Sequence, residues 1–179
     1  MDDVNAATTT VPARRASAER APSFASVAER HLDDVYRYLL VFTRDAQLAE
    51  ELAAETFERA LRAWRRFDPR RSSPRTWLCT VARSAALDHF RAETRRTRRE
   101  QLAADPQRDV EPPDVGLSPQ LDRALRSLSA ADREVIALRV VLDLDAETAA
   151  RLLRISTTAC TTRLNRALQR LEERMTDDD

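Results

Sequence analysis

The chain of 179 residues contains a single glycine, Gly116. Extended sheets need tight turns, and those turns normally require glycine, so a β-rich fold is disfavoured. Alanine, leucine, arginine and glutamate dominate the composition, and all four are good helix formers. The apolar content of 42% is that of a globular chain. The sequence therefore predicts an all-α protein.

Apolar residues recur every three or four positions through much of the first half of the chain. This spacing predicts helices over 24–43 and 46–67, with Leu32 and Leu61 among the residues of their apolar stripes. A third helix is expected to begin near Thr76, as its N-cap, and to run on through an arginine-rich segment. We expect these three helices to pack as one unit.

Two stretches lack this periodicity. Residues 1–21 are expected to form a disordered tail. Between residues 100 and 119 the chain holds four of its eight prolines, its glycine, and five acids against one arginine. We therefore predict that 100–116 is a flexible acidic linker. It separates two small helical domains, 22–99 and 117–177, each able to bury a modest core.

The second domain contains polar residues placed as helix N-caps, namely Ser118, Ser129, Asp145 and Ser156. The helix after Ser129 is expected to reach Val141. The segment 146–153, a short turn and the helix after Ser156 have the proportions of a helix-turn-helix unit, whose second helix enters the major groove of DNA. A helical hairpin inside an ordinary bundle would have the same pattern, so both alternatives remain open.

Positive charge is concentrated between Arg59 and Arg99. This stretch holds thirteen arginines against three acids, a local charge of +10 in a chain whose formal net charge is zero. Trp64, Phe67 and Trp77 are interleaved with the arginines, and Trp77 is expected to anchor the core rather than to stack on a base. The local charge indicates a polyanionic partner such as nucleic acid. A merely solvated charged face is the alternative.

The sequence contains no credible active site. Cys79 and Cys160 form no CxxC or Cys/His cluster, so we expect two buried thiols rather than a disulfide or a zinc site. His31 and His89 lie on predicted helices without matching Cys or Asp partners. No P-loop or nucleophile elbow is present. We predict no enzyme activity, metal or cofactor. Because no apolar run reaches transmembrane length, we also predict a cytoplasmic protein without membrane insertion.

Two long segments resemble those of a known family. The first domain contains AEELAAETFERALRAWRRFDP (Ala49–Pro69) and SPRTWLCTVARSAALDHFRAETRR (Ser73–Arg96). The second contains LRSLSAADREVIALRVVLDLDAETAARLLRISTTACTTRLNRALQRLEER (Leu125–Arg174). In this order they resemble the sigma-two and sigma-four regions of bacterial RNA polymerase sigma factors of the extracytoplasmic-function (ECF) type, in the sigma-70 family. The resemblance covers about 150 of the 179 residues.

The resemblance implies three binding surfaces and their partners. The surface for the β′ clamp helices of core RNA polymerase would comprise Glu50, Glu51, Glu55, Arg59 and Arg62. The surface for the −10 promoter element, where DNA melts, would comprise Arg70, Arg71, Arg75, Arg83, Ser84, Asp88, Arg91, Arg95 and Arg96. The −35 element would be read as duplex by Ser156, Thr157, Thr158, Thr161, Thr162, Arg163 and Arg166. The polymerase β flap and an anti-sigma factor are further partners that the resemblance implies.

Several residues depart from the family pattern. Arg154 stands where glycine is usual before the last helix, and a left-handed residue there would cost about 1 kcal/mol. Ala159-Cys160-Thr161 replaces the usual Thr-Val-Lys and so removes a lysine contact to DNA. Ser84 replaces a common asparagine, and Ala54 replaces a frequent glutamine.

The expected function is therefore that of an ECF sigma factor, which directs core polymerase to promoters and opens them. One alternative is a helical protein-interaction module, such as a sigma-like decoy that binds polymerase without reading DNA. A second alternative is a helix-turn-helix repressor that binds duplex DNA as a dimer. The repressor would leave the basic, tryptophan-containing first domain unexplained.

Overall fold

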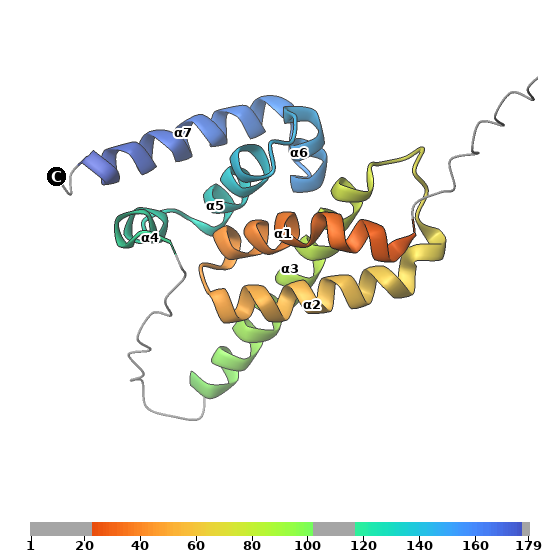
Figure 1. Cartoon of the computed structure of the whole chain (residues 1–179). Coiled ribbons are helices and arrows are strands. Elements are labelled where there is room, and N and C mark those ends of the chain that lie inside the picture. Colours follow the sequence, from red (N-terminus) through yellow and green to blue (C-terminus); the bar gives the residue numbers. More distant parts are fainter. Residues whose placement is uncertain (1–22, 102–116, 177–179) are drawn as a thin grey trace, which may run out of the picture.

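The computed structural model describes residues 23–101 and 117–176, and within them every regular element is a helix, as predicted (Figure 1). The predicted tail and nearly all of the predicted linker lie outside these residues. The described elements are α1 (Phe24–Thr43), α2 (Ala46–Ala63), η1 (Trp64–Arg66), α3 (Pro74–Gln101), α4 (Pro119–Arg126), α5 (Ala130–Ile136), η2 (Ala137–Val141), α6 (Ala146–Leu153) and α7 (Thr157–Thr176).

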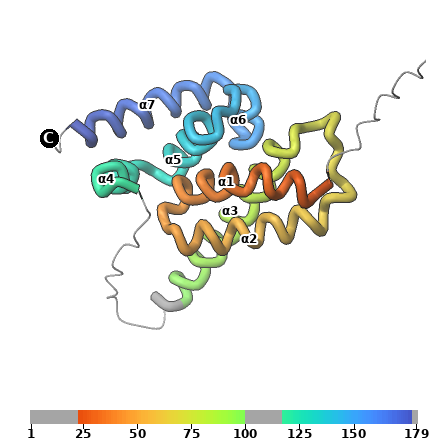
Figure 2. Tube along the Cα trace, viewed as in Figure 1, coloured from red at the N-terminus to blue at the C-terminus, as the bar shows by residue number. Residues whose placement is uncertain are grey.

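The first domain consists of an antiparallel α1–α2 hairpin crossed by the long helix α3 (Figure 2). The side chain of Ser23 caps α1, and Asp45 caps α2 by accepting the Leu48 N–H at 2.9 Å. The predicted start of α3 at Thr76 is wrong. Ser73 Oγ accepts the Thr76 N–H at 3.1 Å, and Pro74 is the first helical residue, because proline has no N–H to leave unsatisfied there.

The second domain contains α4 to α7, and its four predicted N-caps are confirmed: Ser118, Ser129, Asp145 and Ser156 each accept a backbone N–H three residues ahead. The helix predicted to reach Val141 does not continue as an α-helix. It ends at Ile136 and changes into the π-helical turn η2. Leu138 and Leu142, both on or beside this turn, are fully buried.

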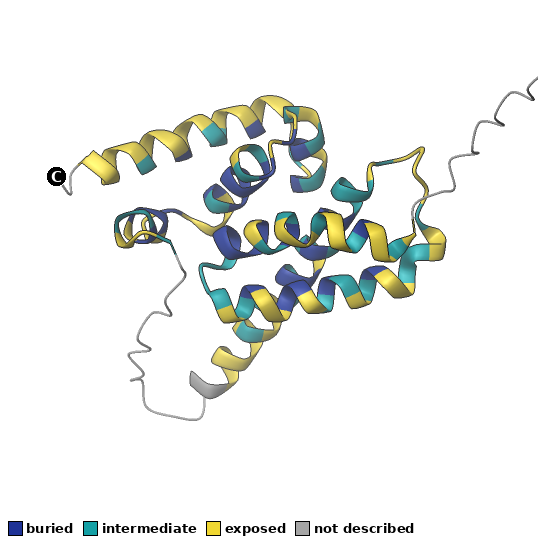
Figure 3. Ribbon diagram, in the orientation of Figure 1, coloured by how far each residue is buried: buried dark blue, intermediate teal, exposed yellow. Residues whose placement is uncertain are grey.

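The two domains pack against each other through α1, which contacts both α5 and η2. Buried residues of both domains join one hydrophobic cluster, including Leu39 of α1 and Leu138 of η2. Figure 3 shows the buried sides of α1 and α5 facing one another, while the outer side of α7 is exposed. The fold therefore has one continuous core with two helical units built on it.

The predicted apolar stripes are too wide at their margins. Leu32 is 52% exposed and Leu61 is 58% exposed, although both fit the helical spacing of buried residues. On α7, Leu168 and Met175 are also exposed. These side chains cost little in water when isolated, but together with charged neighbours they can form contact sites for other proteins.

Candidate polymerase and nucleic-acid interfaces

One side of α2 is exposed along its whole length. We use the name α2 face for its exposed residues, which are Gln47, Glu50, Glu51, Ala54, Glu58, Leu61 and Arg62. Their spacing of three or four residues follows the helical repeat, so they form a single strip. Three predicted polymerase-binding residues, Glu50, Glu51 and Arg62, lie on it. The spacing of Leu61 is that of a core residue, so the sequence did not indicate that it is exposed.

The other two predicted polymerase-binding residues flank this face and link α2 to α3. Arg59 donates to Glu55 Oε1 at 2.6 Å and to Asp88 Oδ2 at 2.9 Å. The hydrogen bond from Arg59 lowers the pKa of Asp88. Asp88 also accepts from Arg91 at 3.4 Å. The structure thus joins residues predicted for polymerase binding to residues predicted for DNA binding, with Arg59 as the link.

Arg75, predicted for −10 binding, is held by α1. Its Nε donates to Asp34 Oδ2 at 2.9 Å, and His31 Nδ1 lies 3.1 Å from the same oxygen. The prediction that His31 has no Asp partner is therefore wrong. Burial alone would raise the pKa of Asp34, but the hydrogen bonds from His31 and Arg75 outweigh burial and lower the pKa below its ordinary value of 3.8.

Replacing Asp34 with asparagine is expected to lower the free energy of unfolding at neutral pH by about 1 kcal/mol. The Asp34 pKa is lower in the folded state, so its contribution is present above the unfolded pKa and disappears as the pH falls through the folded pKa. Urea unfolding across this acid range should show the two proteins converging. Asp33→Asn is the matched control, since Asp33 is exposed and lies 3.8 Å from Arg37. Equal loss in both variants would contradict the prediction.

Arg83, another α3 arginine of the predicted −10 set, is largely buried, with its side chain 20% exposed. Its Nε donates to Glu134 Oε1 of α5 at 2.6 Å. The same carboxylate oxygen accepts from Tyr38 Oη of α1 at 3.2 Å. Burial, and then the neighbouring Glu134 charge, raise the Tyr38 pKa well above its ordinary value. Three helices from two domains therefore meet at Glu134.

The remaining predicted −10 residues lie on open surface. Ser84, Arg91, Arg95 and Arg96 are exposed along α3, and Arg70 and Arg71 are exposed in the loop before it. Arg96 donates to Glu93 at 2.7 Å, one helical turn away. Arg91 and Arg95 are four residues apart and therefore lie on the same side of α3.

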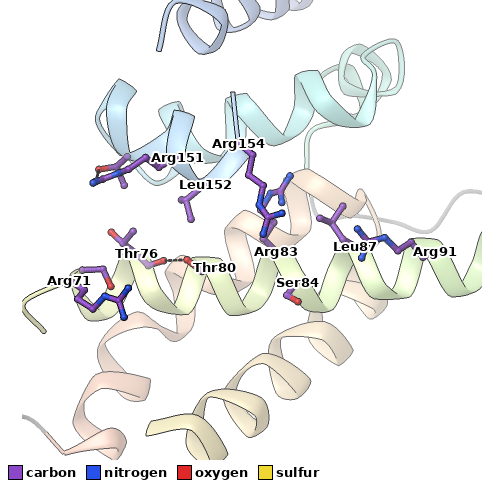
Figure 4. Close-up of a pocket in the computed structure, with 12 residues that line it drawn as sticks. Arg71, Thr76, Thr80, Arg83, Ser84, Leu87, Arg91, Arg151, Leu152 and Arg154 are labelled. Carbon is purple, nitrogen blue, oxygen red and sulfur yellow. Dashed lines mark hydrogen bonds between the residues drawn. The ribbon is translucent and has the colours of Figure 1, made fainter. Parts of the chain in front are cut away.

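A cleft of about 700 Å³ separates α3 from α6 (Figure 4). Five arginines line it: Arg71, Arg83, Arg91, Arg151 and Arg154. Arg151 and Arg154 belong to the second domain, and no pattern in the sequence places them near α3. Ser72, Thr76, Thr80 and Ser84 add hydroxyl groups. The walls therefore present cations and hydrogen-bond donors suited to an anionic chain.

Four aromatic residues form a cluster at the end of the α1–α2 hairpin. The Trp64 and Phe67 rings stack with centroids 4.9 Å apart, and Trp77 lies 5.1 Å from Phe67. Phe24 closes the cluster at 5.5 Å from Trp64. Trp77 is partly buried and packs against the core, as expected of an anchor. The cluster fixes the loop that leads into α3.

The helix-turn-helix unit consists of α6, a turn and α7. Thr157, Thr158, Thr161 and Thr162 are exposed at the start of α7, together with Arg166, and Arg163 is half-buried. Ser156 Oγ instead accepts the Ala159 N–H at 3.1 Å. Cys160 is fully buried, and burial raises its pKa. Cys160 is therefore a core residue. Of the three positions that depart from the family pattern, Thr161, where lysine is usual, is the exposed one that changes the predicted DNA-facing surface most.

The turn requires a left-handed residue, as the resemblance suggested. Arg154 has φ 58° and ψ 43°, and the following Ile155 N–H donates to Ala150 O at 3.1 Å. In this region a Cβ atom crowds the backbone.

Arg154→Gly is expected to raise the free energy of unfolding by about 0.5–1 kcal/mol, since relief of left-handed strain exceeds the entropy that glycine loses on folding. Chemical denaturation would measure it. Arg154→Ala is the control, because alanine removes the guanidinium but keeps Cβ. A gain from alanine equal to that from glycine would show that the guanidinium, and not the backbone, is responsible.

Family models match both domains. The model described as Sigma-70 region 2 matches residues 27–96, which lie in α1 to α3. The model described as Sigma-70, region 4 matches residues 118–171, which cover α4 to most of α7.

Curated relatives and a solved structure agree with these models. The ECF RNA polymerase sigma factor SigM of Bacillus subtilis is 31% identical over 82% of this chain and 91% of its own length. The ECF sigma factor BldN of Streptomyces coelicolor is 32% identical over 92% of this chain, which spans 64% of BldN. Sigma factor RpoE of Bartonella quintana, solved with the anti-sigma factor NepR, has the same fold, with a TM-score of 0.73 at 23% identity over 87% of this chain and 98% of RpoE. The chain therefore belongs to the extracytoplasmic-function sigma factors of the sigma-70 family.

Proposed function

We propose that this ECF sigma factor binds core RNA polymerase through the α2 face, holds the −10 element along α3 and reads the −35 element with α7. The observation that carries this assignment is the separation of charge on two adjacent helices. The α2 face presents Glu50, Glu51 and Glu58, whereas α3 and its preceding loop present the exposed arginines. A protein partner and a polyanionic partner can therefore bind without competing for one surface.

Promoter opening would require no covalent chemistry from this chain. Phosphate contacts by exposed arginines can hold the separated non-template strand, and the binding free energy then favours the melted state. We assign the chain no catalytic step, and we place its action in the cytoplasm, where transcription occurs. No helix in the described residues is long and apolar enough to cross a membrane.

The two halves would then act as units. We propose residues 22–99 for polymerase and −10 binding and residues 117–177 for −35 binding, with the β flap as the polymerase contact of the second unit. A polymerase-binding decoy is not favoured, because the sigma region 4 model matches as well as the region 2 model. An anti-sigma factor is a further proposed partner, since the fold is that of a sigma factor bound by one.

Run-off transcription with core polymerase tests this function. Core enzyme with this protein should start transcripts at discrete genomic promoters, and core enzyme alone should not. Random starts in both reactions would overturn the sigma-factor assignment.

Replacing Arg91 and Arg95 with alanine is expected to weaken open-complex formation and to flatten its salt dependence. Each lost phosphate contact should reduce the slope of log K against log salt by about 0.7–0.9. Filter binding of the holoenzyme to promoter DNA across a salt series measures the slope. Arg37→Ala is the matched control, because Arg37 is an exposed arginine of α1, outside the proposed polymerase and DNA surfaces. An unchanged slope in the double variant would mean that α3 does not contact phosphate.

A further inference from the structure

The second domain occupies part of the α3 surface that the proposed function gives to DNA. Arg83 lies on α3 between other proposed −10 residues, yet its guanidinium is bound by Glu134 of α5. We propose that the second domain competes with DNA for α3 within the free protein, and that Glu134 is the latch which holds this closed form. The DNA half of this inference rests on the proposed function, whereas the latch stands on the contacts alone.

The Glu134 carboxylate is built into its site. The residue is 5% exposed, and Oε1 accepts from Arg83 Nε at 2.6 Å and from Tyr38 Oη at 3.2 Å, while Oε2 lies 3.5 Å from Arg83 Nη2. A guanidinium fork fits the two oxygens of a carboxylate in the same way as two oxygens of a phosphate. Glu134 therefore occupies the position that a DNA phosphate would need in order to bind Arg83.

Two further polar contacts join the domains beside the latch. Arg133 Nε donates to the Phe42 carbonyl oxygen, at the end of α1, at 3.3 Å. Arg44 Nη2 lies 3.6 Å from Asp122 Oδ1 of α4. These two contacts and the apolar packing of α1 on η2 fix how the domains are oriented in the closed form, which therefore does not depend on one ion pair alone.

The cleft beside the latch carries positive charge on both walls. Figure 4 shows Arg154, at the end of α6, reaching toward Arg83 of α3. Arg151 also lines the cleft, opposite the α3 arginines. Like charges on both walls of the cleft oppose closure, and the buried Glu134 carboxylate beside Arg83 offsets part of this repulsion. Without this carboxylate, the open form should become more populated.

The latch can be tested in the full chain by energy transfer between dyes on the two domains. Glu29→Cys on α1 and Gln169→Cys on α7 provide exposed attachment sites, whereas the native Cys79 and Cys160 are buried. Glu134→Gln keeps the shape of the side chain and removes its charge. We expect the ratio of open to closed protein to rise about tenfold, as for loss of one charged hydrogen bond.

Two further variants make the result specific. Glu172→Gln is the matched control, because it removes an exposed α7 carboxylate that does not line the cleft. It should leave energy transfer unchanged. The double variant Arg83→Glu with Glu134→Arg reverses the pair, and it should restore the closed form if the pair is the latch. Wild-type energy transfer in Glu134→Gln would overturn the proposal.

Competition with DNA is measured on the same proteins with a labelled single-stranded oligonucleotide of mixed sequence, about 20 nucleotides long, which exceeds common single-strand site sizes. The Glu134→Gln variant should bind the oligonucleotide about tenfold more tightly than the wild type does. Adding the oligonucleotide to the wild-type protein should reduce energy transfer. Opening without tighter binding would overturn the competition. If the variant opens and binds DNA but supports no transcription with core polymerase, the proposed function fails and the latch stands.

Discussion

Leu61→Asp is expected to weaken binding of core RNA polymerase by about 2 kcal/mol or more, which is roughly thirtyfold in Kd. Leu61 is 58% exposed in the middle of charged neighbours on the α2 face. Protein–protein interfaces commonly have an apolar centre that loses water on binding and a polar or charged rim, and Leu61 with its neighbours has this arrangement. Aspartate there would bury an unpaired charge in the complex and leave the free protein almost unchanged.

Fluorescence anisotropy of labelled protein titrated with core polymerase measures the effect. Leu32→Asp is the matched control, because Leu32 is 52% exposed on α1, outside the α2 face. Thermal melts should be alike for both variants. If both variants bind polymerase as wild type does, α2 is not the polymerase-binding helix; if both lose binding equally, the effect is not specific to the α2 face.

Features decided by neighbouring residues were predictable from sequence. Ser118, Asp145 and Ser156 cap their helices as expected, because a cap depends only on an oxygen and an N–H three residues ahead. The described residues form no strands, as expected, because the composition lacks the glycines that tight turns between strands normally require. The resemblance drew attention to position 154, where glycine is usual, but only the structure shows that the residue there is left-handed.

Features decided by distant residues were not predictable. Arg83 and Glu134 are 51 residues apart, and no periodicity relates them. Periodicity also wrongly indicated that Leu61 is buried. Helical spacing gives the direction of a side chain around the helix axis, but it does not show whether a neighbouring helix covers that side chain. Likewise, Arg59 fits the pattern of an exposed i,i+4 pair, but only the packing of α3 brings Asp88 to its other side. Assigning binding residues from the sequence alone therefore overstated how many are free.

Leu138→Ala is expected to lower the free energy of unfolding by about 2–5 kcal/mol, because it removes a fully buried side chain and leaves a cavity. Leu138 lies on η2, where the second domain packs against α1, so the lost contacts belong to the shared core. Both domains should therefore melt earlier in one transition.

Leu164→Ala on α7 is the contrasting variant. Leu164 is only partly buried, so a smaller loss is expected. Urea unfolding followed by helical circular dichroism and by tryptophan fluorescence separates the cases, because Trp64 and Trp77 report on the first domain alone. Coincident transitions in Leu138→Ala are expected. A tryptophan transition that stays at its wild-type midpoint would show that the two domains keep separate cores, and the closed form would then contribute little to folding stability.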